Sequence, residues 1–487
     1  MKIISPFRNL AAATIAAIAV SSPAQGQTEA PWTKIPIPPL HAFKPVEPKR
    51  IELPNGLVIF LQEDHELPFI NSTILIRGGS RDEPAAKIGL VSLYGQTWRT
   101  SGTAAADGDT LDDRLEAKAA TLETGGGAAL TTMSWSSLKS DFDSVFASAI
   151  DLLLHPAFKA EKLSLARMQM EAGISRRNDD ASGIAGRLSG QLVYGATSPY
   201  AREPQYATVE AVTVADLKSW HDTTVIPNNI IVAVSGDFEP AAMEAKLRAA
   251  FGPLPRGKSM PKTKFDFPGP KPGVYFVDKN DINQSNILIL GLGTERSNPD
   301  FYALSVMNEI FAGGFGSRLF QNVRTKLGLA YSVGGSYGAS YDHPGVFEVS
   351  ASTKSVTTVA ATQAMLEEIG RLKTVPPTTD ELRKAKEDQL NSFIFRYDSP
   401  DKTLFEQVTL AFFGYPKDFL EKYKTGIESV TAADVSRVAN KYIDPSKLAI
   451  LVVGNKSQLT PPVSTLGAVK DIDITIPGKP AGGGSQQ

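Results

Sequence analysis

Two segments of this chain repeat one pattern, and the repeat limits the fold more than any other feature of the sequence. Each copy starts with Val-Thr-x-Ala-Asp, passes a proline, and ends in a run of alternating apolar residues that closes on glycine. The copies occupy residues 212–236 and 430–454, at a constant offset of 218 (430 − 212). Residues 74–78 and 287–291 match in the same way, at an offset of 213 (287 − 74). Offsets this similar over so long a span predict two copies of one domain.

A proline-rich segment separates the two copies. Residues 252–273 contain six prolines, which break helices and cannot donate to a strand ladder. The segment is therefore expected to be an extended and fairly stiff linker. We expect a first domain over residues 45–251, a second domain over residues 274–474, and a disordered tail over residues 475–487.

Apolar periodicity within each half alternates between the strand and the helix pattern. In the first half it predicts strands over 57–62, 70–77, 128–138 and 230–234, and helices over 85–100, 110–122, 142–154 and 159–177, the last followed by a helical run to 194. Pairs of strands with helices between them predict an α+β fold. We expect two homologous α/β-sandwich domains, each with a largely antiparallel sheet covered by helices.

The first 26 residues have the features of a secretory signal peptide. Lys2 and Arg8 precede an apolar run over residues 10–20, and small residues near position 25 suit a cleavage site. The apolar run is about half as long as the ~20 residues that a spanning helix needs. We therefore expect residues 1–26 to be a signal peptide and the protein to be exported, either periplasmic or secreted.

Composition narrows the possible partners and chemistries. The formal net charge is −2 and no basic block is present, so nucleic acid is not an expected partner. The chain has no cysteine, which excludes disulfides, thiolate catalysis and cysteine-based metal sites. No other apolar run is long enough for a membrane span, so none is expected after removal of the signal peptide.

The histidines do not form a metal-binding pattern. They are His41, His65, His155, His221 and His343. No two of them lie within one helical turn, and the start of an H-E-x-x-H motif at His65 fails because position 69 is Phe. We expect no metal site formed by this chain alone.

A glycine-rich segment, residues 313–317, precedes a predicted helix. Helix N-termini bind anions, but no Lys-Ser or Lys-Thr follows the glycines and the preceding segment reads as helix rather than strand. A turn, or a loop that lets another backbone pass close by, is the better interpretation than nucleotide binding.

Arg324 and Tyr331 lie on either side of a predicted change from helix to strand. Gly328 is typical of the residue just beyond a helix C-terminus. One interpretation is structural, with Arg324 complementing the helix dipole and Tyr331 packing on the sheet. The other is functional, with both side chains donating hydrogen bonds to a substrate carbonyl. The residues alone leave both interpretations open.

Several motifs resemble those of the insulinase/pitrilysin-type zinc metallopeptidases, in the branch of the mitochondrial processing peptidases. The resemblance covers residues 51–474, nearly the whole mature chain. Its carriers are Leu-Pro-Asn-Gly-Leu at 53–57, Gly-Ser-Arg-Asp-Glu at 79–83, Gly-Thr at 102–103, Gly-Ser-Arg-Leu-Phe at 316–320 and Gly-Leu-Ala-Tyr-Ser at 328–332. The resemblance implies the processing-peptidase-like fold of two repeated domains.

The family's zinc motif is absent from this chain. Active members carry H-x-x-E-H on a helix of the first domain, where two histidines bind zinc and the glutamate activates water. The resemblance places the histidine positions at Ser92 and Gln96, the base at Gly95, and a later glutamate ligand at Gly173. Glu171 is two residues away, about 200° around a helix, and so on the wrong face. All four chemical positions are therefore vacant.

The family's substrate-binding arginine and tyrosine fall on Arg324 and Tyr331. Some members are two-chain enzymes in which one chain holds zinc and the other supplies this pair, and the substrate adds as a strand to a sheet edge, here residues 126–132. The resemblance thus implies a non-catalytic subunit of a heterodimeric zinc peptidase. Such a subunit binds no cofactor itself, and its partner is a homologous chain with intact H-x-x-E-H and zinc. The alternative is an inactive structural or peptide-binding scaffold.

Overall fold

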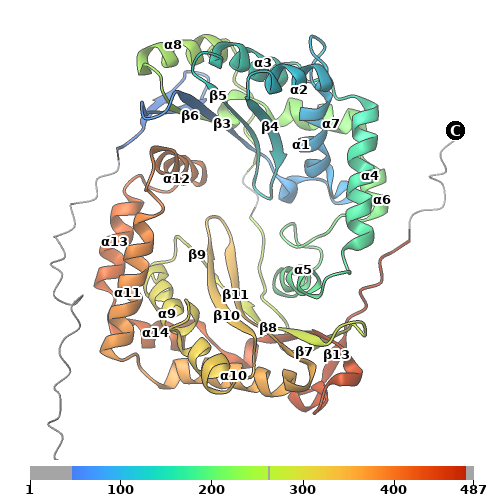
Figure 1. Cartoon of the computed structure of the whole chain (residues 1–487), viewed down its shortest axis with the longest axis vertical. Helices are drawn as coiled ribbons and strands as arrows, with labels where there is room; N and C mark the ends of the chain where they lie inside the picture. Colours follow the sequence, from blue (N-terminus) through green and yellow to red (C-terminus); the bar gives the residue numbers. More distant parts are fainter. Residues whose placement is uncertain (1–45, 262–263, 479–487) are drawn as a thin grey trace, which may run out of the picture. The chain divides into compact units, whose positions relative to one another are not determined.

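The computed structural model describes residues 46–261 and 264–478 (Figure 1). The predicted signal peptide, residues 1–26, and residues 479–487 of the predicted tail lie outside these ranges. Among the helices of the described ranges, none is both long enough and apolar enough to cross a bilayer.

The first sheet takes its strands from residues 49–236 and has the order β1-β2-β6-β3-β5-β4. Its pairings are antiparallel except that of β2 with β6, which is parallel. The strands are β1 (Lys49–Glu52), β2 (Val58–Glu63), β3 (Phe69–Arg77), β4 (Thr121–Gly126), β5 (Leu130–Leu138) and β6 (Ile230–Gly236). The strand β4 therefore forms one edge of the sheet.

The second sheet has the order β13-β7-β12-β8-β11-β10-β9, and its five inner strands repeat the order of the first sheet. The strand β7 pairs in parallel with β12 and β13, and β10 pairs in parallel with β9. The strands are β7 (Gly273–Asp278), β8 (Gln284–Leu292), β9 (Thr294–Glu295), β10 (Ser332–Ser340), β11 (Pro344–Lys354), β12 (Ala449–Gly454) and β13 (Val469–Asp471). The predicted α+β fold is confirmed, with two mixed sheets.

Helices pack on each sheet through apolar residues of alternating strand positions. The first half contains α1 (Leu90–Ser101), α2 (Gly108–Glu116), α3 (Phe142–Leu154), α4 (Ala160–Arg176), α5 (Ala181–Tyr194), α6 (Tyr206–Glu210), α7 (Val214–Thr224) and α8 (Pro240–Phe251). The second half contains α9 (Phe301–Ala312), α10 (Thr358–Thr374), α11 (Thr379–Ile394), α12 (Pro400–Phe413), α13 (Phe419–Ser429) and α14 (Ala432–Tyr442), with a π-helical segment over Phe320–Lys326.

Three of the predicted helices have different limits in the structure. The helix predicted over 85–100 starts only at Leu90, after short 3-10 turns. The helix predicted over 110–122 ends at Glu116, because Ala119 takes a left-handed backbone conformation (φ 48°) and the chain then enters β4. The helical run to 194 is interrupted before α5, where the Asp180 side chain accepts a hydrogen bond from the Gly183 N–H.

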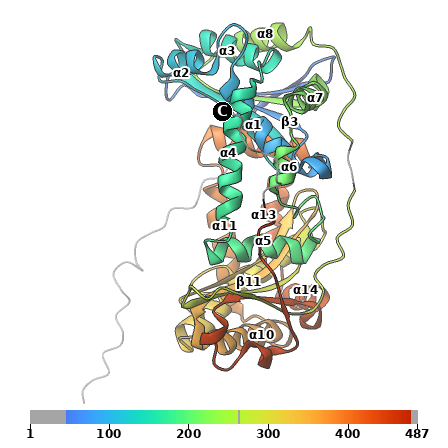
Figure 2. The same ribbon diagram turned by 90° about the vertical axis from the view of Figure 1, so that its right-hand side faces the viewer.

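Each half covers the second face of the other half's sheet with one helix. The helix α5 packs on β8 and β12 of the second sheet, in an apolar cluster that includes Ile184 and Leu288 (Figure 2). The helix α12 packs on the first sheet, where Leu404 and Val408 join a cluster with Phe60 (Figure 1). Because both of their faces are covered, the central strands β6 and β12 are buried along their whole length.

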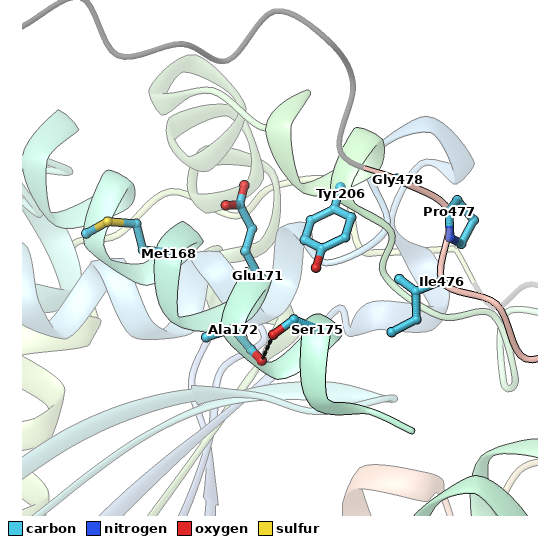
Figure 3. A pocket seen from close by; sticks show the side chains of 8 residues that line it. All are labelled: Met168, Glu171, Ala172, Ser175, Tyr206, Ile476, Pro477 and Gly478. Carbon is cyan, nitrogen blue, oxygen red and sulfur yellow. Dashed lines mark hydrogen bonds between the residues drawn. The ribbon is translucent and has the colours of Figure 1, made fainter. Parts of the chain in front are cut away.

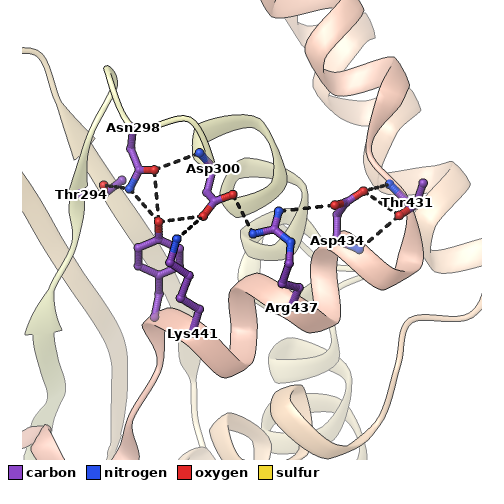
Figure 4. Close-up of polar contacts among 8 residues, drawn as sticks. Thr294, Asn298, Asp300, Thr431, Asp434, Arg437 and Lys441 are labelled. Carbon is purple, nitrogen blue, oxygen red and sulfur yellow. Dashed lines mark hydrogen bonds and ion pairs between the residues drawn. The ribbon is translucent and has the colours of Figure 1, made fainter.

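The sequence repeat reappears in the caps of α7 and α14. Thr213 and Asp216 exchange side chain-to-backbone hydrogen bonds at the start of α7. Thr431 and Asp434 do the same at the start of α14 (Figure 4). In the second copy the cap continues through Arg437 to the partly exposed Asp300 carboxylate at the start of α9, so a local motif also serves helix packing there.

Candidate functional site

The start of α1, which carries the vacant zinc positions, is organised by the motif Gly-Ser-Arg-Asp-Glu at residues 79–83. The Glu83 carboxylate accepts hydrogen bonds of 3.0 Å from the backbone N–H groups of Gly89 and Val91. Gly89 has φ 105°, a conformation that glycine adopts without strain. Burial raises the pKa of Glu83, although these hydrogen bonds oppose the shift. Glu83 therefore serves as a helix cap, where a negative charge complements the helix dipole.

Ser92, Gln96 and Gly173 meet at one place in the structure. The i, i+4 spacing puts Ser92 and Gln96 on the exposed face of α1, and α4 brings Gly173 beside them. All three line a pocket of about 440 Å³. The Gln96 amide donates a hydrogen bond to Oε1 of Gln169 on α4. The positions are thus arranged together, although none carries a side chain typical of a zinc ligand.

Gly95, at the position of the general base, is closed off by the edge strand β4. A Cβ atom placed on Gly95 would lie 2.7 Å from the backbone nitrogen of Gly126. The Thr124 hydroxyl donates a 2.5 Å hydrogen bond to the Gly95 carbonyl oxygen. Close packing of α1 on β4 therefore leaves no room for a glutamate side chain at this position.

Glu171 lies on a different face of α4 from the vacant ligand position. It lines a separate pocket with Met168, Tyr206 and the C-terminal residues Ile476 and Pro477 (Figure 3). The sequence argument that Glu171 cannot replace a glutamate at position 173 agrees with this geometry. Residues 476–478, at the start of the predicted disordered tail, line this pocket.

The residues at the family's zinc position do not fit zinc. Structural and catalytic zinc sites use histidine nitrogen, cysteine sulfur or carboxylate oxygen, whereas Ser92, Gln96 and Gly173 offer a hydroxyl, an amide and no side chain, and Glu203 is the one carboxylate residue that lines the pocket. Within residues 46–261 and 264–478, no three His, Asp or Glu side chains are grouped as metal ligands. No catalytic step through zinc is therefore derived for this chain.

Arg324 and Tyr331 lie close together at the predicted change from helix to strand. Arg324 is in the π-helical segment, Gly328 takes φ 63° beyond its end, and β10 begins directly after Tyr331. The Arg324 guanidinium carbon is 4.8 Å from the ring centre of Phe320 and 5.8 Å from that of Tyr331. Tyr331 is 79% exposed. The structural interpretation required Tyr331 to pack on the sheet, and the exposed ring does not pack there.

The Arg324 guanidinium has no hydrogen bond or ion pair with any residue that the structure describes; its contacts are with the two rings. Cation–π contacts of this kind orient a guanidinium and leave its N–H groups available. The pair can therefore donate to an oxygen atom of another molecule.

Arg318 anchors the segment that carries Arg324, a role that the sequence analysis missed. Its guanidinium donates two hydrogen bonds to the Glu381 carboxylate, at 2.7 and 2.9 Å, and one to the Val375 carbonyl oxygen. The Arg318 hydrogen bonds lower the pKa of Glu381 to about 2. The signal was present in the Gly-Ser-Arg-Leu-Phe motif, but its partner is 63 residues away on α11 and is found only in three dimensions.

The expected substrate edge over residues 126–132 needs correction. The edge strand of the first sheet is β4 (Thr121–Gly126), and from Leu130 the chain belongs to β5, which pairs on both sides. The predicted range straddles the turn between these strands. The prediction was displaced because residues 117–122 were assigned to the preceding helix.

Comparisons with known proteins agree with the fold. The model of the family described as "Peptidase M16 inactive domain" matches residues 211–388. The non-peptidase homolog YmxG of Helicobacter pylori is 23% identical over 410 residues, which cover 82% of this chain and 92% of that protein. An uncharacterized zinc protease of Mycobacterium leprae is 31% identical over 299 residues, which cover 58% of this chain and 64% of that protein.

A solved structure shows the same fold. The crystal structure of a peptidase M16 inactive domain from Pseudomonas fluorescens has a TM-score of 0.76 at 23% identity, covering 84% of this chain and 98% of that one. The chain is therefore similar to proteins of the insulinase-type M16 peptidase family, among them a non-peptidase homolog and a protein named as a zinc protease.

Proposed function

We propose that this chain is the non-catalytic subunit of an exported heterodimeric zinc peptidase. In this role it binds the peptide substrate and presents Arg324 and Tyr331 to a zinc site on a homologous partner chain that carries H-x-x-E-H. Zinc belongs to the partner, and this chain needs no cofactor of its own.

The observation that supports the proposal most strongly is the state of the Arg324 guanidinium. It is held between two aromatic rings but makes no hydrogen bond within the described part of the chain. An arginine with a purely structural role normally satisfies several of its five N–H donors with carboxylates or carbonyl groups, as Arg318 does here. The exposed hydroxyl of Tyr331 adds a second donor beside it.

Two such donors match the chemistry of peptide hydrolysis. Negative charge develops on the carbonyl oxygen of the scissile bond in the transition state, and oriented donors stabilise it by up to about 3–4 kcal/mol each in acyl-transfer enzymes. Because the vacant first-half site does not fit zinc, the reacting carbonyl has to be activated in another chain. A division of roles between two chains accounts for a first domain without zinc ligands and a second domain that carries Arg324 and Tyr331.

The test is reconstitution. The purified chain is mixed with an exported homologue that carries H-x-x-E-H, and zinc content and cleavage of a fluorogenic peptide library are measured for each chain and for the mixture. The proposal expects no zinc and no cleavage from this chain alone, and activity in the mixture that exceeds that of the partner alone. Stoichiometric zinc in this chain, or a mixture no more active than the partner, contradicts it.

The second candidate is an inactive scaffold or peptide-binding protein of the same fold. It is favoured by the similarity to an inactive-domain family and to a protein named as a non-peptidase homolog. The two candidates differ in one result: a scaffold changes no partner's peptidase activity, and Arg324→Ala has no effect on the proteins it holds together.

A further inference from the structure

The C-terminal segment over residues 472–478, which we name the strap, leaves the second half and reaches the first. It follows directly on β13, the strand that pairs with β7 at the edge of the second sheet, and runs from there toward α4 (Figure 1). At its far end, Ile476 and Pro477 line a pocket of about 600 Å³ together with Tyr206 of α6 and residues of α4 (Figure 3). The strap therefore connects the two halves, in addition to the linker and the exchanged helices.

Side chains alternate along the strap between partly buried and exposed. Ile472, Ile474 and Ile476 are partly buried, whereas Asp473 and Thr475 between them are exposed. This is the period of an extended chain, and it places the three isoleucines on one face. Ile472 and Ile474 pack on the apolar cluster of α5, β7, β8 and β12, and Ile476 packs on the core of the first half. One short segment thus contacts the apolar clusters of both halves.

The strap lies beside the turn between α4 and α5. The helix α4 packs on α1 and α6, whereas α5 packs on the second sheet, so residues 177–180 carry the chain from one half to the other. The Asn178 side chain in this turn donates a 2.5 Å hydrogen bond to the Ile474 carbonyl oxygen and accepts one of 2.6 Å from Arg187 of α5. A single turn between two bodies can act as a hinge. The strap adds a second connection next to it, which restrains rotation about the turn.

The last turns of α4 separate the strap from the vacant zinc positions. Ala172 and Ser175 line the pocket at the strap, whereas Gly173 and Ile174 line the pocket that contains Ser92. A movement of this part of α4 therefore changes one wall of the candidate site.

The strap is held less firmly than the strand that precedes it. Beyond β13, the described residues provide two hydrogen bonds between the strap and the rest of the chain. One is donated by Asn178, and the other, of 2.7 Å, runs from the Ile472 N–H to the Phe276 carbonyl oxygen. Segments with few hydrogen bonds and half-exposed apolar side chains open at a lower free energy than that of global unfolding. Detachment of the strap is thus expected to leave both sheets folded.

We propose that the strap is a clasp that locks the turn between α4 and α5. When it is attached, it holds the two halves in the arrangement of this structure. When it is detached, residues 177–180 act as a hinge, and α4 moves relative to the second sheet. This role depends on no property of Arg324, Tyr331 or a partner chain, so it stands or falls independently of the proposed function.

The first experiment tests whether the strap detaches. The chain has no cysteine, so introduced cysteines can be spin-labelled selectively. Ser164→Cys on α4 and Thr475→Cys on the strap, both at exposed positions, report attachment by double electron–electron resonance. We expect one narrow distance distribution in buffer, and its loss at urea concentrations that leave the far-UV circular dichroism unchanged. If the distance is lost only together with the circular dichroism signal, the strap unfolds with the core and the proposal is overturned.

The second experiment tests whether the strap restrains the two halves. Labels at Asp113→Cys on α2 and Glu367→Cys on α10, both exposed, report the distance between the halves. The full chain should give one narrow distribution, and the chain that ends at Asp471 should give a second population of distances. Amide exchange in residues 177–180 should become about tenfold faster in the shortened chain. Identical distances and identical exchange in the two chains overturn the proposal.

Point variants cover the case in which the shortened chain does not fold. The double variant Ile474→Asp and Ile476→Asp removes apolar contacts of the strap and should also give the second population of distances. The matched control Thr475→Asp places the same charge on the exposed face between them and should keep the wild-type distribution. An equal effect of Thr475→Asp contradicts the clasp, because the isoleucine contacts would then not be responsible. Thermal unfolding checks each variant, and loss of the cooperative transition in both the shortened chain and the double variant also overturns the proposal.

Discussion

The guanidinium carbon of Arg324 lies 5.8 Å from the centre of the Tyr331 ring, although six residues and a change from helix to strand separate them. The reversal at Gly328 folds the chain back and places both side chains together. The second half therefore retains a formed pair of donors, whereas the first half retains only the outline of a zinc site.

Removal of either donor should reduce the activity of the reconstituted complex. Arg324→Ala is expected to lower kcat about 100-fold and Tyr331→Phe about tenfold, because each variant loses a donor to the developing oxyanion. Lys326→Ala, which removes an exposed cation two residues away, serves as the control. Steady-state kinetics give the rates, and size-exclusion chromatography checks assembly. Full turnover in Arg324→Ala would remove the pair from the mechanism.

Two helical glycines of the vacant site should respond to alanine in opposite ways. Gly95→Ala forces a Cβ against the backbone of β4 and should lower the free energy of unfolding by about 1–3 kcal/mol. Gly173→Ala meets no atom within 4 Å and should raise it by about 0.5–1 kcal/mol, through better helix propensity. Urea unfolding of both variants measures the difference. Stabilisation by Gly95→Ala would show that α1 and β4 are less closely packed.

Zinc binding should be restorable without restoring hydrolysis. The triple substitution Ser92→His, Gln96→His and Gly173→Glu places two imidazoles and a carboxylate around one pocket, which suits a three-ligand zinc site. Isothermal titration with zinc should show one site per chain, and the double variant that keeps Gly173 should bind more weakly. Peptide cleavage should stay absent, because Gly95 has no side chain to act as a base and β4 leaves no space for one. Cleavage by the triple variant would refute that last step.

Stability should fall on mild acidification because of His221. Its ring is buried and its Nδ1 lies 2.9 Å from the Tyr94 hydroxyl; burial lowers the pKa of His221 to about 4. In the unfolded chain the His221 imidazole has an ordinary pKa near 6.5, so between pH 6.5 and 4 the unfolded chain binds a proton that the folded protein does not bind. The contribution of the neutral His221 ring to the free energy of unfolding is complete above pH 6.5. It declines by up to about 3 kcal/mol as the pH falls to 4.

Urea unfolding of the wild type and of His221→Gln between pH 7.5 and 4.5 measures this effect. The variant should be less stable at pH 7.5, since it disturbs a buried hydrogen bond, but should lose less stability on acidification. Parallel pH profiles for the two proteins would exclude His221 as a source of the acid sensitivity.

The exchanged helices should make the two halves unfold together. Leu404 of α12 is buried against the first sheet, and Leu404→Ala should cost about 2–5 kcal/mol. Its neighbour Phe405 is 59% exposed, so Phe405→Ala should change stability by less than about 0.5 kcal/mol. Calorimetry should show a single transition that shifts in Leu404→Ala. A split into two transitions would mean that the halves unfold independently.

Local patterns made much of the fold predictable. The repeat at an offset of 218 appears as matched strands β6 and β12 and matched caps at Thr213 and Thr431. Helix ends were predicted less well, because the left-handed Ala119 has no signature in the sequence. In the candidate site, the i, i+4 relation of Ser92 and Gln96 follows from helix geometry, and the identity of those residues already excluded zinc ligands.

The sequence by itself thus determined the two-fold repeat and the α+β class, since these depend on residue types and short spacings, and its resemblance to the zinc metallopeptidases located the vacant zinc positions. Only the tertiary structure decided that α5 and α12 exchange sheets, that β4 closes on Gly95, and that Arg324 has no polar partner among the residues that the structure describes. The physical reason is that each of these features is a contact, or the lack of one, between segments far apart in the chain, and no local pattern specifies which distant segments meet.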